Sequence, residues 1–365
     1  MAVATRHRPS PAVGRSVSFA TRRRCGDEAP AALIVPAEPP SSTCAVAAAR
    51  NGQGLRIGSL RSYKMLPKIG EGAFGVVRKA LHRRTGELVA IKSSRGAGAG
   101  GGEALLREAA MLAECAGNPA VVQLREVARG GGAGMDDDGG LHLVMEFVGP
   151  SLHDVMDARR RAGLPFTESE ARRAMRRLLR GVEEMHGHGV VHCDLKPGNM
   201  LIGGEEEAGR GRAIKICDLG LARSVASPAS GDMNTHLQLE GTLWYMAPEQ
   251  LLGDDDMGAP VDLWALGCVM AELVAGEPIF GQKDTVHEHV IEIAHLLGIP
   301  DEVSLMPLGV SSTSTPSRLR DIVPEAGLSP AGYDVLRGLL EFDPKDRLTA
   351  AAALRKPWFS MEDDD

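Results

Sequence analysis

The fold of this chain is decided by one stretch, His192-Cys193-Asp194-Leu195-Lys196-Pro197-Gly198-Asn199, together with Asp218-Leu219-Gly220 further along. These residue types suit phosphoryl transfer, which needs a group to orient the attacking hydroxyl and ligands that hold Mg²⁺ against the phosphates. Asp194 suits the first role, and Asn199 and Asp218 suit the second. Lys196 can neutralise charge on the moving phosphate. The same residue types are common in surface turns, so the interpretation depends on motifs elsewhere in the chain.

A glycine-rich segment lies upstream, at a spacing from a lysine that fits phosphate binding. It reads Ile69-Gly70-Glu71-Gly72-Ala73-Phe74-Gly75-Val76-Val77, and Lys92 follows at the end of an apolar run. Apolar runs on both sides of the glycines favour a hairpin over the strand-to-helix turn of a dinucleotide site. Glycines let backbone N–H groups approach phosphate oxygens, and Lys92 would reach the α- and β-phosphates. Taken alone, the glycines leave a nucleotide-dependent oxidoreductase open as an alternative.

The patterns around this segment predict a small antiparallel sheet that is complete by about residue 148. Order should begin near Tyr63. Further strands are indicated at residues 88–92, 121–124 and 141–147, where β-branched and apolar residues gather.

One helix is predicted within this sheet region. Residues 96–102 are Gly and Ala and should form a flexible tether, and apolar spacing predicts a helix over residues 103–115. Glu108 on this helix is the natural partner of Lys92. A solvated helix face is the alternative place for a glutamate.

The pattern becomes helical after residue 149. Residues 168–185 carry apolar side chains at helical spacing with arginines between them, which predicts an amphipathic helix leading into the quoted loop. Strands at 200–202 and 213–217 should form a hairpin that delivers Asp218, and residues 203–212 are expected to be a charged loop.

A third group of motifs lies towards the end of the chain. Glu249 follows Ala-Pro, and an apolar helix is expected from about Val261. Arg347 could supply a buried bidentate partner for Glu249. Such a pair would be scaffolding, and breaking it costs about 3–5 kcal/mol.

The composition is that of an ordinary globular protein, with 43% hydrophobic and 24% charged residues. We predict no membrane span, because no window approaches 18 uninterrupted apolar residues. Six scattered cysteines without a Cys-x-x-Cys pair favour reduced thiols in an intracellular protein, nuclear or cytoplasmic, over a zinc site or a disulfide framework. Cys193 is interpreted as a filler residue, with a nucleophile as the alternative. The net charge of −7 argues against nucleic-acid binding.

Both ends of the chain have biased compositions. Residues 1–60 are rich in Ala, Pro, Arg and Ser without periodicity, which predicts a disordered basic segment. The first 26 residues hold six Arg and no acid, a composition shared by organelle transit peptides and plain basic tails. Residues 360–365 form an acidic tail.

In their order along the chain, these motifs resemble those of a eukaryotic serine/threonine protein kinase over residues 63–359 or so. The resemblance implies an α+β, bilobed protein-kinase fold that binds ATP and Mg²⁺ in its cleft and acts on protein substrates. A small antiparallel β N-lobe with one main helix would span residues 61–148, and a larger, mostly α C-lobe would span residues 149–359. It also implies ATP contacts at Glu146 and Val148.

Within that branch, several segments are similar to the cyclin-dependent kinases. They are residues 218–223, 242–245 and 296–302. Thr235 resembles the activating threonine, but Cys193 replaces an arginine that helps to bind its phosphate. We therefore expect a weaker phosphorylation switch.

Other departures bear on regulation and specificity. Residues 102–108 keep only the last two residues of the cyclin-binding heptapeptide, so a cyclin partner stays open. Ala73 and Phe74 stand where inhibitory phosphorylation falls, so that brake should be absent. Met246 replaces an arginine that shapes the pocket for a proline after the target residue, which leaves proline-directed specificity open.

Two hypotheses follow from the resemblance. The leading one is an active ATP-dependent kinase, and the alternative is a pseudokinase scaffold that binds partners. A pseudokinase would usually lack Lys92, Asp194 or Asn199, and all three are present.

Overall fold

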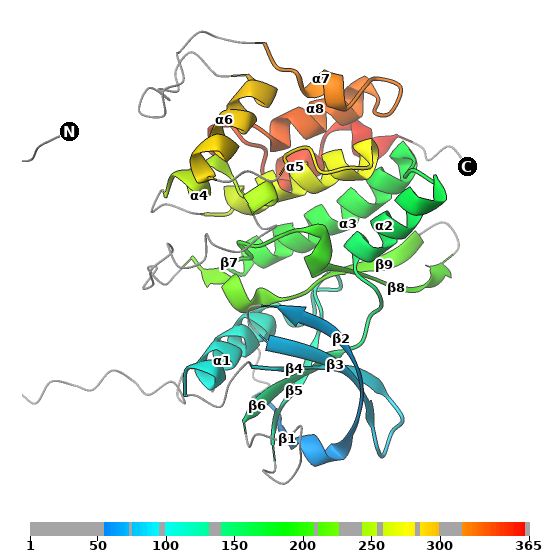
Figure 1. Cartoon of the computed structure of the whole chain (residues 1–365), viewed down its shortest axis with the longest axis vertical. Coiled ribbons are helices and arrows are strands. Elements are labelled where there is room, and N and C mark those ends of the chain that lie inside the picture. The colour runs from blue at the N-terminus through cyan, green and yellow to red at the C-terminus, as the bar shows by residue number, and fades with distance from the viewer. Residues whose placement is uncertain are drawn as a thin grey trace, which may run out of the picture. The chain divides into compact units, whose positions relative to one another are not determined.

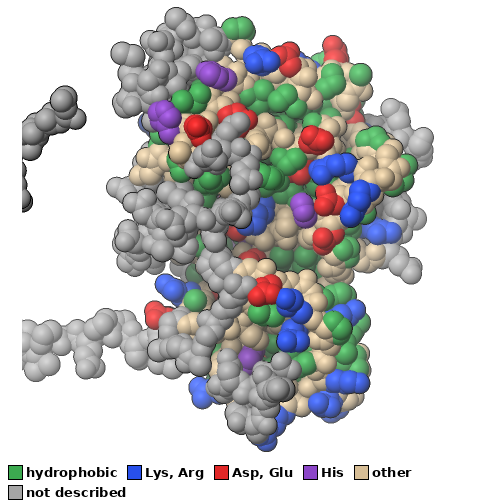
Figure 2. All heavy atoms as spheres, in the orientation of Figure 1, with side chains coloured by type: hydrophobic (Ala, Val, Ile, Leu, Met, Phe, Trp, Pro, Cys, Tyr) green, Lys and Arg blue, Asp and Glu red, His purple; other side chains and the backbone are tan. Residues whose placement is uncertain are grey.

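The computed structural model describes residues 55–72, 75–94, 99–130, 140–207, 211–225, 243–253, 258–281, 285–298 and 316–361. These residues form a β-sheet with one helix, followed by a mainly helical part (Figure 1). Charged side chains of both signs are interspersed on the face that Figure 2 shows. Ala73, Phe74 and Thr235 lie outside the described residues, as do most of both predicted terminal segments.

The sheet has six strands in the order β1-β5-β6-β4-β3-β2. The strands are β1 (Ile57–Ser59), β2 (Tyr63–Gly72), β3 (Gly75–His82), β4 (Leu88–Ser93), β5 (Leu124–Arg129) and β6 (Leu141–Glu146). All pairings are antiparallel except that of the three-residue edge strand β1 with β5, so the predicted small antiparallel sheet is present and one parallel pairing makes the whole sheet mixed. β1 lies at the end of residues 1–60, the segment predicted to be disordered. Three residues are too few to show a hydrophobic period, so the sequence did not indicate this strand.

One predicted strand is misplaced. The strand expected at residues 121–124 is wrong, since β5 only begins at Leu124 and Val121 makes an isolated bridge with Ile216. Val121 and Val122 are buried in the core. A short apolar run thus indicated burial correctly but not strand pairing.

Helix α1 (Ala99–Glu114) packs against β5 and β6. Its buried face consists of Leu105, Ala109 and Leu112, which follow helical spacing. The helix begins four residues before the predicted start, so residues 99–102 of the expected tether are helical, and residues 96–98 lie outside the described residues. Glycine is a weak helix former, but tertiary packing of the apolar face stabilises the helix beyond its intrinsic propensity.

The second part is mostly helical. Its helices are α2 (Leu152–Ala162), α3 (Glu168–Gly187), α4 (Pro248–Leu252), α5 (Pro260–Ala275), α6 (Val286–Leu297), α7 (Leu319–Ile322), α8 (Pro330–Leu339) and α9 (Ala350–Leu354). α3 confirms the predicted amphipathic helix, and Thr167 caps it through a capping box with Glu170. α5 is buried from Val261 to Leu273. No helix among the described residues is long and apolar enough to cross a membrane.

A hairpin connects these helices to the site. It consists of β8 (Met200–Glu207) and β9 (Gly211–Ile216), so the predicted loop over 203–212 is wrong at residues 203–207 and 211–212, which are strand, and residues 208–210 lie outside the described residues. The register pairs Met200 with Ile216. The Cys217 N–H donates to the Asn199 carbonyl oxygen at 2.9 Å, which sets the residues before and after the hairpin side by side. β7 (Val190–Val191) pairs with β10 (Arg223–Ser224).

Buried apolar side chains form two clusters. The large one runs from α1 and one face of the sheet through α3 to α5, and includes Leu143 and Met145. The small one covers the other face of the sheet and includes Ile91 and Val144. Alternation along β6 thus sends neighbouring residues into different clusters, as strand geometry requires.

Candidate active site

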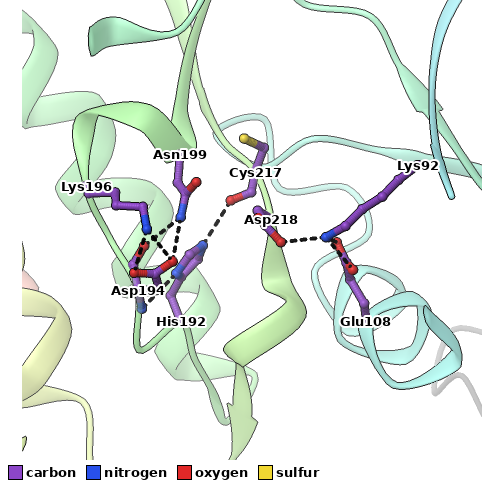
Figure 3. A network of polar contacts seen from close by, with 8 residues as sticks. All are labelled: Lys92, Glu108, His192, Asp194, Lys196, Asn199, Cys217 and Asp218. Atoms are coloured by element: carbon purple, nitrogen blue, oxygen red, sulfur yellow. Dashed lines mark hydrogen bonds and ion pairs between the residues drawn. The ribbon is translucent and has the colours of Figure 1, made fainter. Parts of the chain in front are cut away.

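The ammonium group of Lys92 on β4 is held by two carboxylates (Figure 3). Its Nζ lies 2.7 and 2.8 Å from the two oxygens of Glu108 on α1, and 2.6 Å from Asp218 Oδ1. Lys92 is 4% exposed and Glu108 is 3% exposed. The structure therefore brings the predicted pair together and excludes a solvated face for Glu108.

The charges in this cluster shift one another's pKa. Burial lowers the pKa of Lys92, but the charges and hydrogen bonds of Asp218 and Glu108 outweigh it and raise the pKa above its usual value. Burial raises the pKa of Asp218, yet the charge and hydrogen bond of Lys92 bring it below its usual value. Burial raises the pKa of Glu108 to about 7, against the lowering effect of Lys92. At neutral pH, Lys92 is therefore a fixed cation beside an ionised Asp218.

The loop before β8 brings three polar side chains together. Lys196 Nζ donates to the two carboxylate oxygens of Asp194 at 2.9 and 3.1 Å. Asn199 Nδ2 donates to Asp194 Oδ2 at 3.0 Å and to the Asp194 carbonyl at 2.8 Å. Since Asn199 uses its amide nitrogen in both bonds, Oδ1 is the atom it can offer as a metal ligand.

Asp262 on α5 anchors the start of this loop. Its two carboxylate oxygens accept hydrogen bonds from the backbone N–H groups of His192, at 2.8 Å, and Cys193, at 2.9 Å. His186 Nε2 lies 2.8 Å from the same carboxylate. In the sequence, Asp262 was identified only as a motif residue, and His186 was missed. The one feature of the sequence that could have indicated His186 is its place at the end of a helix before the loop.

Cys193 has an unusual backbone and an inert side chain. Its φ of 65° is in the left-handed region, which costs a non-glycine residue free energy and needs support from its surroundings. Asp262 supplies part of that support. Burial raises the pKa of the Cys193 thiol, so it stays protonated at neutral pH, which favours a filler residue over a nucleophile.

Asp218 lies between the two groups of side chains. Figure 3 shows it with Lys92 on one side and with Asn199 and Asp194 on the other. Its φ of 63° is also left-handed. His192 Nε2 lies 3.1 Å from the carbonyl oxygen of Cys217, which ties the loop to the segment that carries Asp218.

The glycine-rich segment forms the predicted hairpin of β2 and β3. Gly75 has a φ of 143°, and a Cβ there would lie 2.0 Å from the Ser93 carbonyl oxygen, so packing alone requires glycine. A Cβ at Gly72 would meet no heavy atom within 4 Å. Packing therefore does not explain glycine at 72.

The two nucleotide contacts predicted at the end of the sheet, Glu146 and Val148, make different kinds of interaction in the structure. Glu146 Oε1 accepts from Lys215 Nζ at 2.6 Å and from the Gln123 N–H at 2.9 Å, so its carboxylate is already used. The Glu146 N–H also donates to the Gln123 carbonyl oxygen, at 3.0 Å. Val148 packs closely on Gly203, where a Cβ would lie 2.6 Å from its Cγ1.

Comparison with known proteins agrees with this geometry. The family described as "Protein kinase domain" matches residues 63–359. The chain belongs to the protein kinase family. This match excludes the oxidoreductase alternative, and the kinase uses ATP, as its family does.

Individual relatives show which branch of the protein kinases this chain resembles. It is 43% identical over 318 residues to the putative cyclin-dependent kinase F-2 of Oryza sativa subsp. japonica, covering 83% of this chain and 91% of that protein. It is 38% identical over 322 residues to cyclin-dependent kinase G-2 of Oryza sativa subsp. indica, covering 84% and 42% respectively. With cyclin-dependent kinase B2-2 of Arabidopsis thaliana the identity is 35% over 321 residues, covering 85% and 96%. The kinase is therefore a serine/threonine protein kinase that resembles the cyclin-dependent kinases, which confirms the predicted resemblance.

Proposed function

We propose that Asp194 orients the hydroxyl group of a protein substrate for attack on the γ-phosphate of ATP. The observation that carries this proposal is the position of its carboxylate, which Lys196 and Asn199 hold at 2.9 and 3.0 Å. Because catalysis of phosphoryl transfer is mainly positioning and electrostatics, a carboxylate fixed in this way suits the role. Lys196 also places a cation where the transferred phosphate would pass.

Asn199 and Asp218 are proposed to hold Mg²⁺. Their amide and carboxylate oxygens are hard ligands of the kind that Mg²⁺ prefers, and Mg²⁺ is usually bound by one or two carboxylates together with substrate phosphates. The residues present therefore fit the ion. When bound, Mg²⁺ neutralises negative charge on the phosphates.

Lys92 and the hairpin of β2 and β3 are proposed to bind the phosphates of ATP. Glu108 positions the Lys92 ammonium through two hydrogen bonds. The room for a Cβ at Gly72 supports a ligand, rather than packing, as the reason for glycine there. Ile69, Gly70, Glu71, Val76 and Val77, with the main chain of Glu146 and with Val148, complete the proposed nucleotide contacts.

An assay with labelled ATP and a generic basic protein tests the role of Asp194. Asp194→Asn should lower transfer by about 10²–10⁴-fold, the range that a positioned acid–base group contributes. Asp321→Asn is the matched control, because Asp321 on α7 is exposed and should be dispensable. Full activity in Asp194→Asn would refute its role, and transfer by neither wild type nor variant would indicate a pseudokinase scaffold instead.

We also propose that this kinase does not need a cyclin to form its Lys92–Glu108 pair. The pair is present in the single chain, and residues 102–108 keep only the end of the family's cyclin-binding heptapeptide. With Cys193 in place of a phosphate-binding arginine, Thr235→Ala should retain activity. Loss of all activity in Thr235→Ala, or activity only after a cyclin is added, would contradict this proposal.

A further inference from the structure

A pocket of about 210 Å³ lies where the C-terminal ends of α2 and α5 meet. Its wall is mostly apolar, with a few charged side chains at defined places. The apolar side chains include Met156, Phe166 and Leu273, and the charged ones are Arg159, Arg160 and Glu272. The pocket shares no residue with the candidate active site.

Glu272 brings a carboxylate into this apolar wall. It is 1% exposed, and its Oε2 accepts a hydrogen bond from the Tyr245 hydroxyl at 2.7 Å. Burial raises the pKa of Glu272 above its usual value, against lowering effects that include the Tyr245 hydrogen bond and the charge of Arg160. No described residue donates a hydrogen bond to Oε1, and this atom is not sealed from solvent. Oε1 therefore offers an unfilled acceptor position to the pocket.

The two arginines of the wall are held by acids of their own. The guanidinium nitrogens of Arg159 donate to the two oxygens of Glu170 at 2.8 and 2.9 Å. Arg160 Nη1 donates to Asp157 Oδ1 at 3.0 Å. The arginines are thus fixed in place, and these hydrogen bonds go to acids other than Glu272.

The surroundings of Oε1 select a neutral donor as its partner. A ligand carboxylate would be repelled by Glu272, and a ligand cation would lie near the charge of Arg160. Since sites for drug-sized ligands measure roughly 300–1,000 Å³, a pocket of about 210 Å³ suits a single side chain. The indole of tryptophan combines a large apolar ring with one N–H donor and no acceptor, which matches one acceptor in an apolar wall.

We propose that this pocket anchors a tryptophan side chain of a partner protein, with the indole N–H donating to Glu272 Oε1. The ring would pack between Met156 and Phe166. Leu164 at the rim is 61% exposed and would contact the residues beside the tryptophan. A buried aromatic anchor of this kind often supplies much of the binding energy of an interface.

The proposed anchor is connected to the segment before α4. Tyr245, which shares the Glu272 carboxylate, ends the short helical turn Leu243–Tyr245 and is 8% exposed. A bound tryptophan and this turn would therefore be joined through one carboxylate. The inference goes beyond the proposed phosphoryl transfer and does not depend on it.

Two dye-labelled peptides of the same neutral sequence test this inference. One contains tryptophan, and the other contains benzothienylalanine, in which sulfur replaces the indole N–H in a ring of nearly the same shape. Fluorescence anisotropy measures the Kd of each peptide for the kinase without nucleotide. The tryptophan peptide should bind about tenfold more tightly, because only its ring can donate a hydrogen bond to a carboxylate.

Variants of the pair show whether Glu272 is the acceptor. Tyr245→Phe should keep the preference for tryptophan, since Oε1 is unchanged. Glu272→Met/Tyr245→Phe replaces both ends of the buried hydrogen bond by apolar groups, which is nearly neutral for stability, and should bind the two peptides equally. Thermal unfolding confirms that each variant is folded.

A matched pair of leucine variants tests the location. Leu164→Ala should weaken binding of both peptides about threefold by removing apolar contact at the rim. Leu88→Ala removes an exposed leucine from β4 instead and should change neither Kd. Equal binding of the two peptides by wild type, a preference that persists in Glu272→Met/Tyr245→Phe, or tighter binding of a lysine peptide would overturn the inference.

Discussion

The ion pair between Glu249 and Arg347 yields the sharpest prediction about stability. The two guanidinium nitrogens donate to the two carboxylate oxygens at 2.6 and 3.0 Å, and the residues are 6% and 5% exposed. Arg347 also donates to the main-chain carbonyls of Glu341, Pro260 and Phe342. Arg347 therefore donates hydrogen bonds to four separate groups, the Glu249 carboxylate and three main-chain carbonyls. In these contacts Glu249 interacts with Arg347 alone.

This asymmetry sets the expected magnitudes. Arg347→Met leaves a buried carboxylate without its cation and should lower the free energy of unfolding by about 5 kcal/mol, the upper end of the range for breaking a buried pair. Glu249→Gln keeps the shape and leaves the guanidinium with its carbonyl acceptors, so it should cost only about 1.5–3 kcal/mol. Adding Glu249→Gln to Arg347→Met removes the stranded charge, so the double variant should be more stable than Arg347→Met alone.

Urea unfolding followed by tryptophan fluorescence measures these differences, since the Arg347 guanidinium lies 5.1 Å from the Trp264 ring. Arg318→Met is the control, because Arg318 pairs with Asp321 at the surface, where its side chain is 69% exposed. Such a pair should contribute less than about 0.5 kcal/mol. A cost below about 1 kcal/mol for Arg347→Met, or a double variant less stable than that single one, would refute the reasoning.

Three further predictions concern the active site. Gly75→Ala should lower the free energy of unfolding by about 2 kcal/mol or more through strain and a clash with Ser93. Gly72→Ala should leave stability unchanged and raise the KM for ATP. Equal stability of the two variants would contradict this prediction. Iodoacetamide at neutral pH should leave Cys193 unmodified in native protein, because burial raises its thiol pKa, and peptide mapping that finds it alkylated before unfolding would disprove this. Asp218 has a pKa below its usual 3.8, so its pairing stabilises the fold above that pH and is lost on acidification. The stability difference between wild type and Asp218→Asn should therefore be constant above about pH 5 and shrink as the pH falls below about 4, and a difference that stays constant down to about pH 2 would count against the pairing.

The sequence predicted much of the candidate site because each functional side chain lies in a short motif of fixed spacing. Asp194 and Asn199 are five residues apart, so a single loop turn decides their proximity. Glu108 and Lys92 come from different elements, but each element had a clear helical or strand pattern. The anchoring of the loop by Asp262 was out of reach, because nothing local to residue 262 indicates which backbone groups it will meet.

The misplaced elements share a physical cause. The strand β1 and the start of α1 depend on contacts with residues that are distant in sequence. The three residues of β1 and the glycines at the start of α1 show no hydrophobic periodicity from which either element could be predicted. The hairpin of β8 and β9 continues through residues whose glycine and charge content is typical of loops. In each case tertiary pairing overrode local propensity, which is a weak guide for short segments.

The state of α1 decides how the kinase could be controlled. A helix that carries the partner of a catalytic lysine must be held in place by something, either a second chain or its own packing. Here Leu105, Ala109 and Leu112 are at most 2% exposed against the sheet and the core beneath. Burying such side chains contributes roughly 1.5–3 kcal/mol for each leucine, which is as much as a typical allosteric coupling supplies. The packing of α1 against the core supports the proposal that a cyclin is not required to form the Lys92–Glu108 pair.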